Sequence, residues 1–447
     1  MLGSNPARNG RTPDRSPGIA LTTSKPATNE GFRLRLRPGV PTARTFYPGT
    51  DSLQMLWAIL RGHAPRTLRH PWLSKACAVL LLVATLPACG CNHPLSAART
   101  VTSTRSRISV LAGGDVIAQR AVRLAAQQTN GGGLAGWESL LTHLQPLLQH
   151  VDLRFCNLES PILLNAPLAR PEPGKEFPKF YGPTDLVGSL RNIGFNVVSV
   201  ANNHAHDMGV GGVQQTRSAV RAAGLVPVGY TRKGIPQIPV LRLGAWKVSF
   251  IGATTKMNES MPQGFTRWDV FEVDVNHPEP LLAAVRKAAK KGPVFVSLHG
   301  GVQWGLSPDP AFRRLGYALC DNGATLVLCQ HAHVAQAVEV HVTPDGRRCL
   351  IAWCLGNLCA VERRPVGNLG MLVHVVLDAD AAHRLGVVAA SWEPTWSLQD
   401  DGHVTIVPLD NGSVLARRAR ALAACRAALR AAEKRIGPRQ IFGTANR

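Results

Sequence analysis

The residues best suited to chemistry in this sequence stand where apolar, β-branched runs end. Such runs are typical of buried strands, and the carboxyl ends of strands in an open α/β sheet converge on one crevice. A polar residue has little reason to recur at that place in strand after strand. The polar residues at these run ends are Asp115, Asn157, Glu159, Asn202, Asn203, His204, His299, His331, His333 and Asn357.

Two carboxylates, one amide and three imidazoles among these residues suit a divalent cation such as Mn²⁺, Fe²⁺ or Zn²⁺. Alternate residues of an extended His-x-His segment point the same way, so we expect His331 and His333 to reach a shared site. Taken singly, each residue has a plainer interpretation: a lone histidine is commonly a core or surface residue, Asn203 could form a turn, and Asp115 could cap a helix. Several such explanations would be needed together, so the sequence favours a site for one or two metal ions.

The elements that must position these residues alternate along the chain. Helix-like stretches, such as 183–193 and 308–321, separate the apolar runs, and continuously apolar strands are buried on both faces. We therefore expect an α/β sandwich, with a closing hairpin around Asp400-Asp401-Gly402 and an outer helix over 412–435. The apolar runs cover 108–115, 151–159, 195–204, 247–254, 293–301, 324–333, 349–357 and 370–378.

The formal net charge of +22 does not indicate a nucleic-acid-binding protein, because the excess charge lies at the two ends of the chain. Residues 1–107 hold 15 Lys and Arg against 3 Asp and Glu, and residues 413–447 hold 9 against 1. Residues 108–412 hold 26 Lys and Arg against 24 Asp and Glu. A basic tail can touch phosphates or anionic lipid, but solvation is its commoner role, so nucleic acid is not an expected partner.

The 10 cysteines do not form the pattern of a disulfide framework in a chain this long. Those beyond residue 91 are scattered without C-x-x-C spacing, and four of them fall in apolar runs. A buried thiol behaves as a small hydrophobe. We therefore expect these four to be core residues rather than zinc ligands: Cys156, Cys329, Cys354 and Cys359.

The first part of the chain is interpreted as an export signal that precedes the folded domain. Residues 1–54 lack apolar periodicity and are interpreted as disordered or as an over-long translation start. Residues 55–91 run from bases through a short apolar stretch to small residues, which is the order of a signal peptide. Leu86-Pro87-Ala88-Cys89 also resembles a lipobox, which predicts lipidation of Cys89. Residues 92–107 are polar and small and would form a linker.

Taken in order, the motifs resemble those of the CapA family of poly-γ-glutamate capsule synthesis proteins. The resemblance covers about 108–378, and the run VVSVANNHAHDMG is its most specific part. It implies a metallophosphatase-like (calcineurin-type) multilayer α/β sandwich with mixed sheets over 108–411, followed by a C-terminal helix and basic tail over 412–447. The motifs are Gly114-Asp115, Asn157-Leu158-Glu159, Ala201-Asn202-Asn203-His204 with Asp207 and Gly209, Ser297-Leu298-His299-Gly300-Gly301, His331-Ala332-His333-Val334 and Leu355-Gly356-Asn357.

The resemblance also implies roles for single residues. His204 would protonate a leaving group or steady developing negative charge, and Asp207 would orient its imidazole. Glu159 would bridge the ions if two are bound. Supporting roles would fall to Asn157, Asn202 and Asn357. The metal ligands would be Asp115, Glu159, Asn203, His299, His331 and His333.

Three departures from the family pattern bear on substrate preference, although none removes an expected ligand. The segment Asp115-Val116-Ile117 lacks the second-position histidine of ordinary metallophosphatases. Gln303 stands where the family commonly has a glutamate. Cys329-Gln330 replaces the usual Gly-His and Ala332 replaces a proline, so the loop before His333 is expected to differ in shape.

Three functions fit these expectations. The first is an envelope enzyme that hydrolyses or transfers an amide or phosphoester bond of an anionic polymer, poly-γ-glutamate or an envelope glycan. Lys175, Lys179 and Arg267 are candidate bases beside its crevice. The others are a non-enzymatic accessory protein of a membrane synthase complex and a periplasmic phosphoesterase. We expect export and a lipid anchor, on the outer side of the cytoplasmic membrane or in the periplasm. His204 beside a full ligand set favours chemistry, because a structural site needs no proton donor.

Overall fold

The computed structural model describes residues 105–167, 179–259, 269–409 and 419–443, which belong to one compact unit, Arg99–Arg447. Several predictions concern residues outside these ranges. They are the extension 1–54, the signal peptide 55–91 with Cys89, residues 92–104 of the linker, and the candidate bases Lys175 and Arg267. Within the described ranges, no helix combines the length and the apolar character needed to cross a bilayer.

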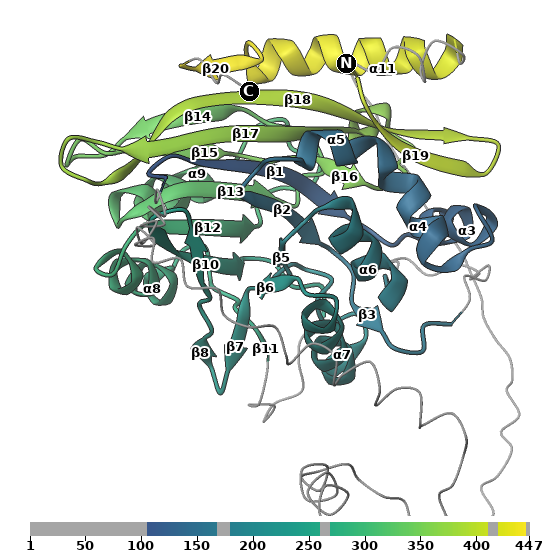
Figure 1. The fold of residues 1–447 in the computed structure, drawn as a ribbon, viewed down its shortest axis with the longest axis horizontal. Helices are drawn as coiled ribbons and strands as arrows, with labels where there is room; N and C mark the ends of the chain where they lie inside the picture. The colour runs from purple at the N-terminus through teal and green to yellow at the C-terminus, as the bar shows by residue number, and fades with distance from the viewer. Residues whose placement is uncertain (1–104, 168–178, 260–268, 410–418, 444–447) are drawn as a thin grey trace, which may run out of the picture. The chain divides into compact units, whose positions relative to one another are not determined.

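Two mixed β-sheets form the centre of the fold (Figure 1). Four neighbouring strands of each sheet are parallel: β1, β2, β5 and β6 in the first, and β10, β12, β13 and β15 in the second. The first sheet has the order β19 (His403–Pro408), β18 (Leu385–Asp400), β17 (Leu369–Ala379), β1 (Ile108–Val116), β2 (Leu153–Leu158), β5 (Val197–Ser199), β6 (Val226–Val228), and β16 (Asn357–Cys359) pairs with β1. The second has the order β14 (Val338–Val342), β15 (Arg348–Ala352), β13 (Ala324–Gln330), β12 (Val294–His299), β10 (Trp246–Thr254), β9 (Val240–Leu243).

The two sheets pack face to face through one apolar core. Phe155 of β2 contacts Phe250 of β10 with ring centroids 5.3 Å apart, and Phe250 meets Phe295 of β12 edge to face at 6.0 Å. Helices cover both outer faces, which is why strands on either side are continuously apolar. In Figure 1, α8 (Glu279–Ala289) and α9 (Pro310–Asp321) lie on one side of the sheets, and α3 (Arg120–Gln128), α4 (Gly133–Leu141) and α6 (Thr184–Ile193) on the other. The result is the predicted multilayer α/β sandwich.

The remaining elements complete the two layers around the sheets. Helix α7 (Gly209–Ala222) packs with α6 on the first sheet, and α4 is followed without a linker by η1 (Thr142–Leu144) and α5 (Gln145–Leu148), which break the helical run into three pieces. Proline at the second position of α5 explains this break, since proline has no N–H to continue a preceding helix. Two small sheets complete the set: β7 (Tyr230–Arg232), β8 (Ile235–Pro236) and β11 (Asp269–Val270), and β3 (Ile162–Leu163) with β4 (Gly182–Pro183).

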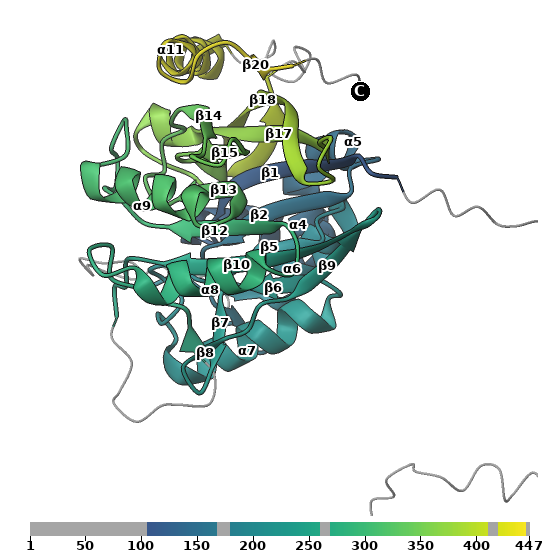
Figure 2. The same ribbon diagram turned by 90° about the vertical axis from the view of Figure 1, so that its left-hand side faces the viewer.

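The predicted closing hairpin is confirmed, because β18 and β19 pair antiparallel up to Asp400 and His403. Asp401 and Gly402 between them both have positive φ, 44° and 78°, as the favoured two-residue hairpin turn requires. The C-terminal helix α11 spans Ala419–Ile436 and lies across β18 in both Figure 1 and Figure 2. A short strand that the sequence did not predict, β20 (Gln440–Phe442), then pairs with β18.

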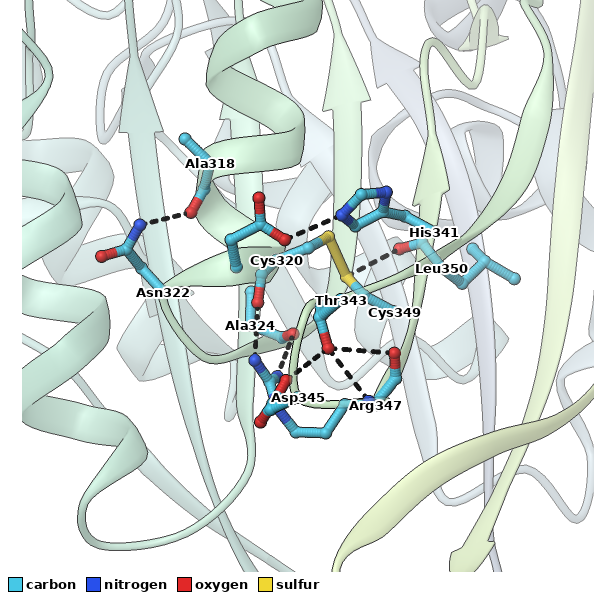
Figure 3. Close-up of a disulfide and its surroundings, with 11 residues drawn as sticks. Ala318, Cys320, Asn322, Ala324, His341, Thr343, Asp345, Arg347, Cys349 and Leu350 are labelled. Atoms are coloured by element: carbon cyan, nitrogen blue, oxygen red, sulfur yellow. Dashed lines mark hydrogen bonds and ion pairs between the residues drawn. A yellow bond between two sulfur atoms is a disulfide. The ribbon is translucent and has the colours of Figure 1, made fainter.

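The cysteines divide into a disulfide and a set of buried thiols. Cys320 at the end of α9 and Cys349 in β15 are joined, a bond that the scattered spacing did not predict (Figure 3). Arg347 lies beside the bond and donates from Nη2 to the carbonyl oxygen of Cys320 at 2.9 Å. The four cysteines expected in the core are buried and free, and burial raises the pKa of the Cys359 thiol to about 12. Such a thiol stays protonated and does not compete for metal.

Candidate metal centre

The ends of parallel strands from both sheets bring the predicted carboxylates and imidazoles into one cluster. Asp115 lies near the end of β1 and Glu159 directly follows β2, whereas His299 ends β12 of the other sheet. All are buried. Two overlapping groups each have their metal-binding atoms within 4.8 Å of one another: Glu159, His299 and His331, and Asp115, Glu159 and His333. Glu159 belongs to both, the arrangement that a bridging ligand needs.

The Glu159 carboxylate shows that the cluster fits a cation. Within the described residues, both of its oxygens are buried and lack a hydrogen-bond donor. Its Oε1 faces Nε2 of His299 at 3.5 Å and Nε2 of His333 at 3.9 Å. Burial, and then the neighbouring Asp115 carboxylate, raise the pKa of Glu159 well above its usual range. Burying an ionised carboxylate without a partner costs free energy. A divalent cation bound among these oxygen and nitrogen donors would offset that cost.

The imidazoles are held largely in the neutral form that binds metals. Burial lowers the pKa of His299 well below its usual value, and burial and the His333 charge lower the pKa of His331 to about 3. His333 is the exception. Burial lowers its pKa, but the Asp115 carboxylate, 3.3 Å from Nδ1, together with Asn357 and Glu362 outweighs burial and raises it.

The loop that carries His331 and His333 differs from the expected extended segment. Strand β13 ends at Gln330, and the two histidines have positive φ values of 99° and 55°. Their rings still reach the same cluster, with centroids 6.1 Å apart, but through a bent backbone. The shared site was therefore predicted for the wrong reason. Such backbone conformations are disfavoured outside glycine and concentrate at functional sites.

The three predicted supporting asparagines orient this cluster. Asn157 donates from Nδ2 to Oδ1 of Asp115 at 2.8 Å. Asn357, at the start of β16, places its Oδ1 2.9 Å from Nδ1 of His333, which leaves Nε2 of that ring toward Glu159. Asn202 donates to the carbonyl oxygen of Leu158 at 2.9 Å and lies 3.4 Å from Oδ1 of Asn157. Partners of this kind fix the rotamer and tautomer of a ligand.

His204 and Asp207 form the predicted pair at the edge of the cluster. Nδ1 of His204 lies 2.7 Å from Oδ2 of Asp207, and both side chains are buried. The same carboxylate oxygen accepts the backbone N–H of Phe180 at 2.7 Å, and the Phe180 ring lies 4.3 Å from the imidazole. The imidazole is thus fixed on two sides, with Nε2 directed away from Asp207.

Asn203, the remaining predicted ligand, is oriented by a residue that the sequence did not reveal. Its Oδ1 lies 2.8 Å from Nε2 of His299, while its Nδ2 donates to Oδ1 of Asn258 at 3.1 Å. Nδ2 of Asn258 also lies 3.4 Å from Nε2 of His204. Asn258 follows a strand end, so the rule used for the other residues could have found it; the motif comparison did not include it.

Two other residues also depart from expectation. His206 lies in the most specific motif but was assigned no role; its Nε2 lies 2.7 Å from Oδ1 of Asp269 and its Nδ1 3.0 Å from the carbonyl oxygen of Glu259. Burial lowers its pKa, but the hydrogen bonds to Asp269 and Glu259 and the nearby carboxylate charges together outweigh burial and raise it. Lys179, a candidate base, is paired with Glu259 at 2.9 Å on the surface, so its charge is already compensated.

The sandwich is of the metallophosphatase-like class, and its strand ends carry a cluster of candidate metal ligands. The comparison with protein families agrees: residues 109–361 match the model described as bacterial capsule synthesis protein PGA_cap. This match covers more than half of the chain, and the chain belongs to this family. The family predicted from the motifs is thereby confirmed.

Two curated relatives carry related names. The capsule biosynthesis protein CapA of Bacillus anthracis is 28% identical over 229 residues, which are 50% of this chain and 54% of that protein. The PGA biosynthesis protein CapA of Bacillus subtilis (strain 168) is 25% identical over 247 residues, which are 55% and 61%. The chain thus spans little more than half the length of these relatives. A solved structure, TT1561 of Thermus thermophilus, has a TM-score of 0.31 and 11% identity over 63% of this chain and 97% of that one, too low a similarity for any conclusion.

Proposed function

We propose that this protein is a metal-dependent enzyme of the cell envelope that hydrolyses or transfers a bond in an anionic polymer, poly-γ-glutamate or an envelope glycan. The main support for this proposal is the fixed His204–Asp207 pair beside the buried Glu159 carboxylate. That carboxylate lacks a hydrogen-bond donor among the described residues. A site that only held the fold together would have no need of an oriented imidazole at its edge. The names of the two Bacillus relatives support the choice of polymer.

The chemistry divides between the cation and the protein. One or two divalent ions, Mn²⁺, Fe²⁺ or Zn²⁺, held by the six ligand residues would supply Lewis-acid polarisation. Asp207 keeps the proton on Nδ1 of His204, so a second proton is given or taken at Nε2. Asn258, 3.4 Å from Nε2, and the ring of Phe180 hold that nitrogen in place.

The experiment compares the full-length protein with His204→Ala, using metal content and turnover of γ-linked glutamate chains as separate measurements. We expect His204→Ala to keep its metal and to lose turnover by a factor of about 100 to 10,000. His341→Ala is the matched control, since it removes another His–Asp pair, 2.8 Å from Asp321 and outside the cluster. Equal turnover in the wild type and His204→Ala would contradict the proposed role of His204.

One observation favours a non-enzymatic accessory protein as the second candidate. The ligand side chains are buried, none more than 7% exposed, and structural metal sites are typically closed. In that case metal would stabilise the protein, and neither γ-linked glutamate chains nor phosphoesters would be turned over by the wild type. We would then expect the protein to co-purify with a membrane synthase. Turnover of phosphoesters alone would instead indicate the periplasmic phosphoesterase.

We also propose export and lipidation at Cys89, as the leader sequence predicts. The Cys320–Cys349 disulfide supports this proposal, because structural disulfides persist in oxidising compartments outside the cytoplasm. Metabolic labelling with a fatty acid tests it: wild type should be labelled and Cys89→Ala should not. A labelled Cys89→Ala variant would place the anchor elsewhere.

A further inference from the structure

A second group of residues beside the metal cluster has the chemistry of a subsite for an anionic chain. Trp304 lies in the loop between β12 and α9, and its ring centroid is 5.6 Å from that of His333. The guanidinium of Arg364 lies over the same indole, 5.1 Å from its centroid. The indole is therefore held between a candidate metal ligand and an arginine.

The backbone of Trp304 is fixed in a conformation that bulky residues rarely adopt. Its φ is 64°, in the left-handed region, and its N–H donates to the carbonyl oxygen of Ala332 at 2.9 Å. Gln336 donates to the carbonyl oxygen of the next residue, Gly305, at 2.9 Å. A Cβ on Gly367 would stand 2.8 Å from the indole, so that position accommodates the ring. Disfavoured conformations held this firmly concentrate at functional sites.

The guanidinium of Arg364 is exposed beside this indole, and among the described residues it forms no ion pair. Glu362, two residues earlier, is close enough for the two charges to interact, but its carboxylate accepts a hydrogen bond from Nε2 of Gln119 at 2.7 Å. An exposed cation without an ion-pair partner in the described part of the chain thus stands over the indole that contacts His333.

Apolar surface accompanies the charge. Val302 and Leu306, on either side of Trp304 in the loop, are 55% and 57% exposed. Large apolar side chains at this exposure beside an aromatic ring and an arginine suit a ligand that alternates anionic groups with aliphatic atoms.

We propose that Trp304 and Arg364 form a subsite for one repeat of an anionic polymer next to the metal cluster. Arg364 would pair with the carboxylate of the repeat, and the indole with Val302 and Leu306 would contact its aliphatic spacer. A γ-linked glutamate chain has such a repeat, and this choice of polymer rests on the proposed function.

The test measures binding, not turnover, in the full-length protein. A γ-linked glutamate oligomer is titrated calorimetrically against the wild type, Trp304→Ala, Trp304→Phe, Arg364→Ala and Lys290→Ala, with metal content measured on each preparation. Lys290 directly follows α8 and precedes the amino-terminal end of β12, away from the cluster, and its replacement removes the same single charge. The same oligomer with amidated carboxyl groups serves as the neutral probe.

We expect Trp304→Ala and Arg364→Ala each to weaken oligomer binding about tenfold, with metal content unchanged. Trp304→Phe should retain most of the affinity, Lys290→Ala all of it, and the neutral probe should bind Arg364→Ala and the wild type alike. Wild-type affinity in both alanine variants overturns the subsite. Loss of metal in Trp304→Ala, with normal binding by Arg364→Ala, also overturns it, since Trp304 would then only support His333. If the variants bind the oligomer as expected but the wild type does not turn it over, the proposed enzymatic function is contradicted and the subsite is not.

Discussion

Asn258 holds Asn203 at two points: its backbone N–H donates to the Asn203 carbonyl oxygen at 3.0 Å, and its side-chain oxygen accepts the Asn203 amide at 3.1 Å. The second contact decides which end of the Asn203 side chain faces the cluster. With Nδ2 occupied by Asn258, Oδ1 is turned to His299. An amide binds a cation only through its oxygen, so this contact selects the ligand orientation.

Asn258→Ala should therefore weaken metal binding by roughly tenfold without unfolding the protein. The measurement is the dissociation constant for Mn²⁺ by calorimetry, accompanied by the thermal unfolding midpoint. Asn276→Ala, at an exposed position nearby in the chain, is the control and should bind as the wild type does. Unchanged affinity in Asn258→Ala would show that Asn203 needs no such support.

Glu159→Gln should change the pH dependence of stability in the metal-free protein. Since burial raises the folded-state pKa of Glu159 above its unfolded value, the contribution of Glu159 to stability is fully present below the unfolded pKa and is lost as pH rises through the folded one. The variant carries no titrating carboxyl there and should be more stable at alkaline pH by about 1 kcal/mol or more. Denaturant unfolding in chelator across that range measures the difference.

Added metal should make the wild type more stable than Glu159→Gln. Mn²⁺ in excess should raise the unfolding midpoint of the wild type, because binding to the folded state alone stabilises it, and should leave Glu159→Gln nearly unaffected. A wild type whose midpoint ignores both chelator and metal would count against a metal site at Glu159.

Gly114→Ala should be severely destabilising. A Cβ at this position would stand 1.8 Å from the carbonyl oxygen of Gly356, the same oxygen that accepts the N–H of Asp115 at 3.0 Å. Strand β1 and the segment that precedes β16 would have to separate, at a cost of about 3 kcal/mol or more. Gly386→Ala is the matched control, because a Cβ there meets nothing within 4 Å. Denaturant unfolding of both variants gives the comparison, and equal stabilities would contradict the close approach.

Removing the Cys320–Cys349 bond should cost about 3 kcal/mol, since it closes a loop with a sequence separation of 29 residues. The paired variant Cys320→Ala, Cys349→Ala is compared with Cys425→Ala, which replaces a buried free thiol by the same residue. Mass spectrometry after alkylation, with and without reductant, should show two cysteines protected in the mature protein. Full alkylation without reductant would remove this support for an oxidising compartment.

The sequence determined much of this protein by itself. Strands that are buried on both faces must be apolar along their whole length, and helical stretches separate such runs in this sequence. The α/β sandwich with strands near 108, 294 and 324 could therefore be predicted. Polar residues at the ends of those runs follow the same logic, and the predicted ligands do meet. The order of the motifs predicted the family, and the family comparison confirms that prediction.

Tertiary structure alone decided the rest. The run over 195–204 contains a strand of only three residues, Val197–Ser199, because the chain then turns into the cluster to present Asn203 and His204. His331 and His333 reach the cluster through positive φ, which no side-chain pattern specifies. Asn258, Trp304 and Arg364 gain their roles from neighbours far along the chain. Periodicity reports which face of an element is buried, whereas the orientation of an amide or the stacking of an indole depends on what the opposite sheet places beside it.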